Sequence, residues 1–107
     1  MNELTVEVVL DSAGRHRLKT VKFFDRGLVD FVVVYYVVEN SSNVPLVSFD
    51  FAHGFFHRDL RYLPDDDGRK KRRLPAAKSL KDLYDFSVAD VHKNWKRYYL
   101  DYLGRSH

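Results

Sequence analysis

The chain has 107 residues, which is the size of one domain and too short for two well-formed cores. Its composition is 45% hydrophobic and 15% aromatic, which supplies a packed interior and argues against intrinsic disorder. The absence of cysteine excludes disulfides, thiolate nucleophiles and cysteine-based zinc sites. We therefore expect residues 1–107 to form a single domain.

The net charge of +3 is divided unevenly along the chain. Residues 1–52 carry five Lys and Arg against seven Asp and Glu, whereas residues 53–107 carry thirteen against eight. A positive excess in one half indicates a surface that attracts a polyanion, although it is also typical of a solvated face. No run of about 18 apolar residues is present, and the first residues do not resemble a signal peptide, so we expect a cytoplasmic protein without a membrane span.

The N-terminal half shows the period of two that is typical of β-strands. It predicts strands over residues 4–10, 17–24, 31–38 and 44–51, separated by clusters of turn residues. The third run, which begins at Phe31 and ends at Val38, is apolar on both faces, and its β-branched and aromatic residues favour a central strand. Beyond it we expect extended chain over residues 55–63 and a hairpin arm over 69–74.

From Ser79 the apolar period changes to about 3.6, with Ser79 and Asp82 forming an N-terminal cap and Gly104 just past the end. This predicts a helix over residues 79–103. The fold class is therefore α+β, an antiparallel sheet of about five or six strands with one long C-terminal helix packed on one face. One helix covers one face only, so the run from Phe31 to Val38 is expected to contact a second copy of the chain, a partner protein or a curled part of the sheet.

The ten residues 50–59 concentrate the polar side chains that could carry chemistry. If this part is extended, His57 and Asp59 share one face of the strand. A carboxylate at this spacing can accept the imidazole N–H, fix its tautomer and raise its basicity. Arg58 then faces the apolar side and needs a carboxylate partner, for which Asp50 is a candidate.

His53 precedes Gly54, which lets the backbone bend and could bring His53 towards His57. Metal-independent RNA cleavage needs a base for the 2′-hydroxyl, an acid for the leaving 5′-oxygen and a cation for the phosphorane. We therefore interpret four residues as candidate catalytic groups that need no cofactor: His53, His57, Arg58 and Asp59. The spacing of the two histidines suits a metal only on a helix, which Gly54-Phe55-Phe56 disfavours, so we expect no metal site.

The residues around this stretch could hold the RNA. A basic run can neutralise flanking phosphates, and an exposed tyrosine ring can stack on a base. The candidate substrate-binding residues are Asp50, Tyr62, Lys70, Lys71, Arg72 and Arg73. Structural roles remain open for all of these residues. A histidine beside glycine often only supports a turn, Arg58 and Asp59 could form an ordinary ion pair, and a basic run can protect the edge of a sheet.

An aromatic-Asp-x-Ala-His segment at residues 49–53 follows the β-rich half, and the cluster His57-Arg58-Asp59, a charged hairpin and a helix with Asn94-Trp95 come after it. This layout resembles small prokaryotic proteins that are similar to the TumE-like toxins of toxin–antitoxin pairs. The resemblance implies a cytoplasmic toxin that acts on RNA and is neutralised by a small DNA-binding antitoxin. The apolar strand leaves a second interpretation open, a non-enzymatic module for protein interaction or for assembly into a homodimer.

Overall fold

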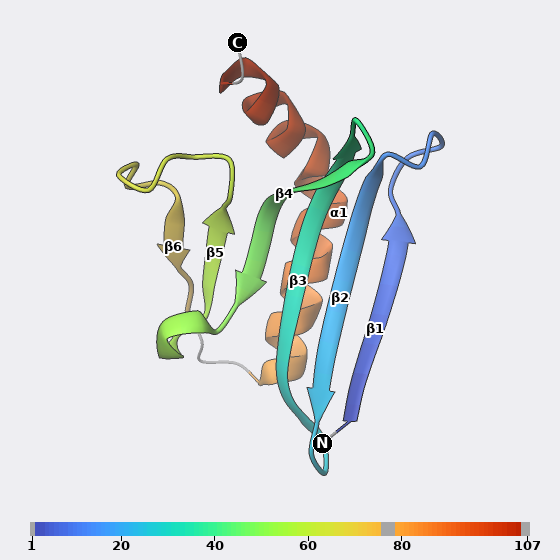
Figure 1. Cartoon of the computed structure of the whole chain (residues 1–107). Helices are drawn as coiled ribbons and strands as arrows, with labels where there is room; N and C mark the ends of the chain where they lie inside the picture. Colours follow the sequence, from blue (N-terminus) through green and yellow to red (C-terminus); the bar gives the residue numbers. More distant parts are fainter. Residues whose placement is uncertain (1, 76–78, 106–107) are drawn as a thin grey trace.

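The computed structural model of the chain describes residues 2–75 and 79–105, apart from the side chain of His53. One long helix, α1 (Leu80–Arg105), packs on an antiparallel sheet whose strands follow one another in chain order (Figure 1). The strands are β1 (Asn2–Val9), β2 (His16–Phe24), β3 (Leu28–Glu39), β4 (Ser42–Asp50), β5 (His57–Leu60) and β6 (Lys71–Arg73), with a 3₁₀ turn, η1 (Ala52–Gly54), after β4. The predicted α+β fold is confirmed.

The central hairpin, β3–β4, closes through a turn of only two residues. Asn40 and Ser41 have φ angles of 50° and 64°, and Glu39 pairs directly with Ser42. Two successive residues with positive φ give the turn whose twist matches that of the flanking strands, and asparagine adopts this conformation more readily than most residues. The sequence predicted a five-residue loop here, so the strands are longer than expected.

Three predicted boundaries differ from the structure at the C-terminal side. The hairpin arm expected over residues 69–74 is a strand only from Lys71 to Arg73. The extended segment expected over residues 55–63 is a strand only from His57 to Leu60, because the Leu63 amide donates to the Leu60 carbonyl (3.1 Å) and turns the chain. The helix continues through Gly104 to Arg105. Its start agrees with the prediction, since the Asp82 amide donates to the Ser79 hydroxyl (3.2 Å) and satisfies one of the unpaired amides of the first turn.

The core lies between α1 and one face of the sheet. Rings from β3 contact rings from the helix. The ring centres of Phe31 and Tyr84 are 5.6 Å apart, and those of Tyr35 and Trp95 are 6.3 Å apart. Phe49 of β4 is 1% exposed. The residues of the strands that alternate with these side chains face the opposite side, which we call the open face.

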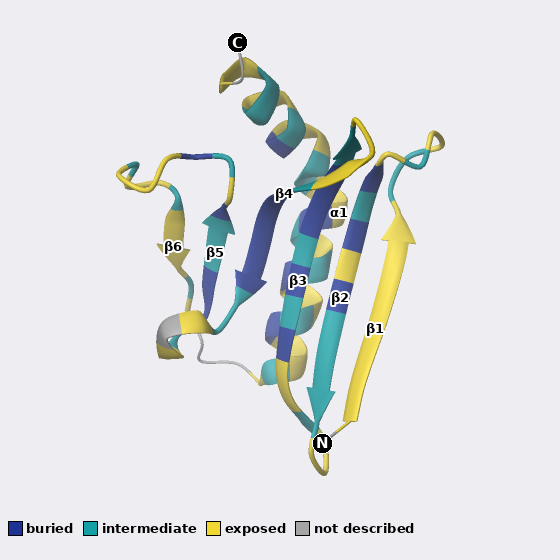
Figure 2. Ribbon diagram, in the orientation of Figure 1, coloured by how far each residue is buried: buried dark blue, intermediate teal, exposed yellow. Residues whose placement is uncertain are grey.

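Burial decreases from the middle of the sheet to its β1 edge (Figure 2). α1 packs mainly on β3 and β4, and every residue of β1 is exposed. On the open face of β3, Val32, Val34 and Val38 are half-buried, and Tyr36 is 7% exposed. The surface predicted for a partner therefore exposes less apolar area than the sequence suggested, while large exposed apolar side chains occur on β1, at Leu4, Val6, Val8 and Val9.

Candidate functional site

Three strands bring polar side chains together on the open face. Asp50 pairs with His57 and Ser48 with Asp59 across β4 and β5, and β6 continues both rows. Because alternate residues of a strand point to opposite faces, the side chains form two rows of three. The first row is Asp50, His57 and Arg73, and the second is Ser48, Asp59 and Lys71. His57 and Asp59 thus share a face, as the strand alternation predicts.

The His57 imidazole is 2% exposed and lies between two hydrogen-bond acceptors. Its Nε2 is 3.2 Å from Oδ1 of Asp50, and its Nδ1 is 3.3 Å from the Phe55 carbonyl oxygen. A ring protonated on both nitrogens can donate to both acceptors, whereas a neutral ring can donate to one. The carboxylate that contacts the ring belongs to Asp50 on the neighbouring strand, whereas the sequence spacing suggested Asp59.

The turn after β4 fixes the position of the Asp50 carboxylate. Its Oδ1 also accepts a hydrogen bond from the Ala52 amide (2.9 Å), which is the local pattern by which aspartate starts a turn. Gly54 ends the turn with a φ of 82°, so the predicted bend at this glycine is present. The side chain of His53 lies outside the described residues, and its predicted approach to His57 stays a prediction.

Ser48 and Asp59 are neighbours in the second row of the open face. Within the described part of the chain, the buried atoms Ser48 Oγ and Asp59 Oδ1 have no hydrogen-bond partner. Leaving such an atom buried and unpaired costs about 1–3 kcal/mol. A hydroxyl and a carboxylate therefore lie side by side in this row, next to Lys71.

Arg58 points to the other side of β5, towards α1, so the structure does not bring it together with His57. Its guanidinium lies beside the Tyr98 hydroxyl, which donates to Oδ2 of Asp90 (2.6 Å). Burial and this hydrogen bond raise the pKa of Tyr98 to about 12, and the charge of Arg58 works against the rise. Asp50, the partner suggested for Arg58 from the sequence, lies on the open face.

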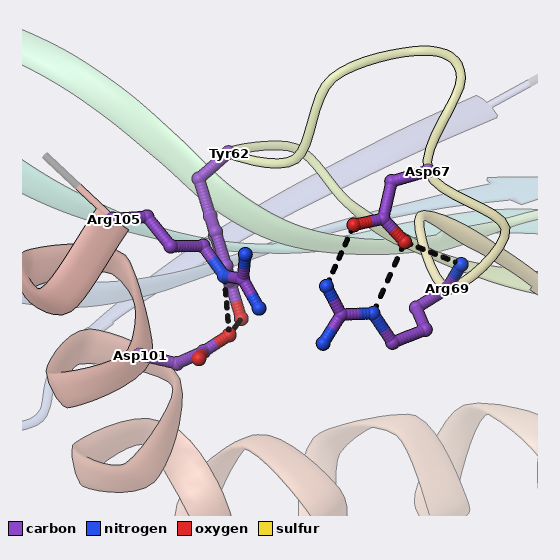
Figure 3. Close-up of polar contacts among 5 residues, drawn as sticks. All are labelled: Tyr62, Asp67, Arg69, Asp101 and Arg105. Atoms are coloured by element: carbon purple, nitrogen blue, oxygen red, sulfur yellow. Dashed lines mark hydrogen bonds and ion pairs between the residues drawn. The ribbon is translucent and has the colours of Figure 1, made fainter.

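Tyr62 connects the end of β5 to the end of α1. Its hydroxyl donates to Oδ2 of Asp101 (2.7 Å), and Nε of Arg105 lies 3.5 Å from the same oxygen (Figure 3). Burial, together with the hydrogen bond, raises the pKa of the Tyr62 hydroxyl. Its ring packs edge-on against the Tyr102 ring, with 6.1 Å between the two ring centres. The ring predicted to stack on a base is thus used in contacts with the helix.

The predicted basic run divides into two parts. Lys70 is 2.7 Å from Asp65, and in the same loop Arg69 donates to both carboxylate oxygens of Asp67, which lowers the pKa of Asp67 to about 2 (Figure 3). The three residues of β6 are exposed, and none has an ion-pair partner among residues 2–75 and 79–105. These residues are Lys71, Arg72 and Arg73.

Sequence reasoning did not single out Ser48, Arg97 or Tyr98. Tyr98 is 4% exposed and fits the apolar period of the helix, which is typical of a core residue. Arg97 lies beside it, with its guanidinium carbon 5.8 Å from the Tyr98 ring centre. Neighbouring residues of a helix point in different directions, so the helical pattern contains no signal that would have placed Arg97 beside β5. Among the described residues, no group of three or more histidines and carboxylates lies close enough to hold a metal.

The family comparison covers the whole chain. A family model described as Domain of unknown function (DUF7718) matches residues 1–107, and the chain belongs to this family. No curated protein and no solved structure matches it. Within the described part of the chain, no helix combines the length and the apolar character that crossing a membrane would require.

Proposed function

We propose that this member of the DUF7718 family is a toxin-like, RNA-directed protein that binds an RNA backbone across its β5–β6 edge. The observation that carries the proposal is β6 itself, three consecutive basic residues that are all exposed. Lys71 and Arg73 extend the two polar rows of the open face, and Arg72 lies on the other side, opposite Arg58. A phosphate backbone that follows the edge would meet positive charge on both sides.

Binding can be measured by fluorescence anisotropy with a single-stranded RNA at several salt concentrations. The double variant Lys71→Gln/Arg73→Gln should weaken binding and reduce the slope of log K against log salt by about 1.4, since each phosphate contact on a single strand contributes about 0.7. The control Lys19→Gln/Lys93→Gln makes the same change in charge at exposed positions away from β6. Equal weakening by both variants would mean that only net charge matters, and the proposed edge would be wrong.

Toxicity can be tested separately by inducing the chain in cells without any partner. Growth should stop with the wild type and continue with Lys71→Gln/Arg73→Gln at equal protein levels. Unchanged growth with the wild type would contradict the toxin part of the proposal and leave RNA binding to be judged by the titration.

Metal-independent RNA cleavage is a second candidate activity, and the pair of Asp50 and His57 is the observation that favours it. The carboxylate holds the imidazole as it would a general base. The ring is 2% exposed, so a substrate reaches it only if side chains around it move, and the nearby Phe55, whose ring centre is 5.4 Å away, is one candidate. RNA cut by the wild type in a metal chelator, but not by Asp50→Asn, would support cleavage. Intact RNA with the wild type would exclude it and leave the binding function.

A non-enzymatic interaction module remains the alternative, and β1 is the observation that favours it. This strand is an exposed edge of eight residues, with Leu4, Val6 and Val8 on one side. Long apolar edges pair readily with other chains. Light scattering over a range of concentrations decides: a second copy of the chain should pair with the wild type and not with Val6→Lys, whereas a strict monomer would count against the module.

A further inference from the structure

A cleft of about 260 Å³ lies between β5 and the C-terminal half of α1. It opens on the side of the sheet opposite the two polar rows, because Arg58 and Phe49 face α1. Polar groups at the ends of long side chains line most of it, with one apolar residue from the strand. The lining residues are Arg58, Leu60, Tyr62, Arg97, Tyr98 and Asp101.

The two arginines of the cleft have no carboxylate partner within the described residues. Asp101 also lines the cleft, but its carboxylate accepts the Tyr62 hydroxyl and lies 3.5 Å from Arg105. Asp90 is likewise engaged by Tyr98 and Asn94. The positive charge of Arg58 and Arg97 is therefore not compensated by an ion pair.

A third arginine increases this charge. Arg72 of β6 is the direct register partner of Arg58 and shares its side of the sheet. Like charges opposite each other on adjacent strands destabilise a sheet. In addition, Nε of Arg58 is buried without a hydrogen-bond partner among the described residues. A bound anion would offset the repulsion between these guanidinium groups.

We propose that the cleft binds a single phosphate group. The planar guanidinium matches two phosphate oxygens at once, so Arg58 and Arg97 offer two such groups to one phosphate. The volume is below the range of about 300–1,000 Å³ for pockets that enclose drug-sized ligands, so it suits a phosphate rather than a whole nucleotide. For RNA as the source the inference rests on the proposed function; inorganic phosphate offers the same chemistry.

The test is calorimetric titration of the full chain with three probes: inorganic phosphate, an RNA oligonucleotide with a 5′-phosphate, and the same oligonucleotide with a 5′-hydroxyl. Arg97 is exposed, so Arg97→Gln should keep the fold, which a thermal midpoint verifies. The control is Lys93→Gln, an exposed change of equal charge one turn earlier on α1 that lines a different hollow. Loss of a charged hydrogen bond predicts at least about tenfold weaker phosphate binding in Arg97→Gln and no comparable loss in the control.

The outcomes separate the site from the function. Phosphate binding that Arg97→Gln weakens, in a protein that binds neither RNA, supports the cleft and contradicts RNA binding. RNA binding that Arg97→Gln leaves unchanged, with no binding of inorganic phosphate, overturns the cleft and leaves the β6 edge. A 5′-phosphate that strengthens RNA binding in the wild type but not in Arg97→Gln identifies a terminal phosphate as the occupant. Equal losses in Arg97→Gln and Lys93→Gln also overturn the inference.

Discussion

The two edges of the sheet are built in opposite ways. β1 has eight exposed residues, with apolar side chains on the helix side and Glu3 and Glu7 on the other. β6 has three exposed residues, all of them basic. Both edges leave backbone groups unpaired, but a short charged edge resists the addition of another strand, and a long apolar edge invites it. Both edges are thus exposed, but β1 carries apolar side chains and β6 carries only basic ones.

The two edges also differ in how closely they adjoin the buried core. β6 is paired with β5, whose Leu60 is 8% exposed and whose neighbour Phe56 is 1% exposed. β1 is paired with β2 at the side that the helix leaves uncovered. A binding site is more precise on rigid elements with a packed core beneath them. The β5–β6 side meets this condition better than the β1 side does.

The largest expected effect is on stability, and it compares the packed strand β4 with the exposed strand β1. Phe49→Ala removes a ring that is 1% exposed and contacts Phe56 and Phe86, and we expect it to lower the free energy of unfolding by about 3–5 kcal/mol. Val6→Ala, on a strand where Val6 is 44% exposed, should cost less than about 1 kcal/mol. Urea denaturation measures both. Similar losses would mean that β1 is packed as firmly as β4.

The next effect concerns the pair of Asp50 and His57 in the first polar row. Asp50→Asn removes the carboxylate charge that lies 3.2 Å from Nε2 of His57, and we expect a loss of about 1–3 kcal/mol in unfolding free energy. Asp65→Asn removes a carboxylate that is 98% exposed, and no measurable change is expected. A double-mutant cycle with His57→Gln isolates the pairwise coupling. A coupling near zero would show that the two side chains are neighbours without mutual stabilisation.

A smaller effect is expected for the pH dependence of stability, which involves His16 at the start of β2. Burial lowers the pKa of His16, against the attraction of Asp11, while the unfolded ring titrates near 6.5. The unfolded state therefore binds the proton more readily, so stability is maximal above about pH 6.5 and falls as pH decreases through the lowered pKa of the folded state. One proton limits the slope to about 1.4 kcal/mol per pH unit.

Two variants test this assignment by urea denaturation between pH 5 and 8. His16→Gln removes the buried ring, which accepts or donates a hydrogen bond with the Tyr35 hydroxyl at 2.8 Å, and should flatten this part of the pH profile. His92→Gln replaces an exposed histidine on α1 and should leave it unchanged. If the slope persists in His16→Gln, another group is responsible.

The smallest effect is expected at β6. Lys71→Gln/Arg73→Gln changes exposed side chains without ion-pair partners among the described residues, so unfolding free energy should stay within about 0.5 kcal/mol of the wild type. A larger loss, measured by the same denaturation, would give these residues a structural role and weaken the interpretation of their binding phenotype.

Much of the fold was predictable because it depends on local patterns. Alternation located the first four strands, and the change of period located the helix to within a few residues. The pattern did not locate every buried position of α1, since Ser87 is buried and its hydroxyl donates to the Leu83 carbonyl. A polar residue that satisfies itself within its helix is invisible to a pattern of hydrophobicity.

The candidate site was harder because it depends on which strands are adjacent. The parity of β5 correctly separated His57 and Asp59 from Arg58. The contact of His57 with Asp50 and the pairing of Ser48 with Asp59 depend on the β4–β5 register, which residues within one strand do not encode. That Arg97 and Arg58 line the same cleft depends on how α1 crosses the sheet, which residue spacing does not encode.

The central claim, that the β5–β6 edge and not the β1 edge contacts RNA, is tested most directly by amide NMR. A single-stranded RNA is titrated into the labelled chain, and the shift of each amide is followed. We predict the largest shifts at residues 57–60 and 71–74 and on α1 around Arg97, with β1 unchanged. Shifts concentrated on β1, or no shifts at RNA concentrations that saturate the anisotropy signal, would contradict the account.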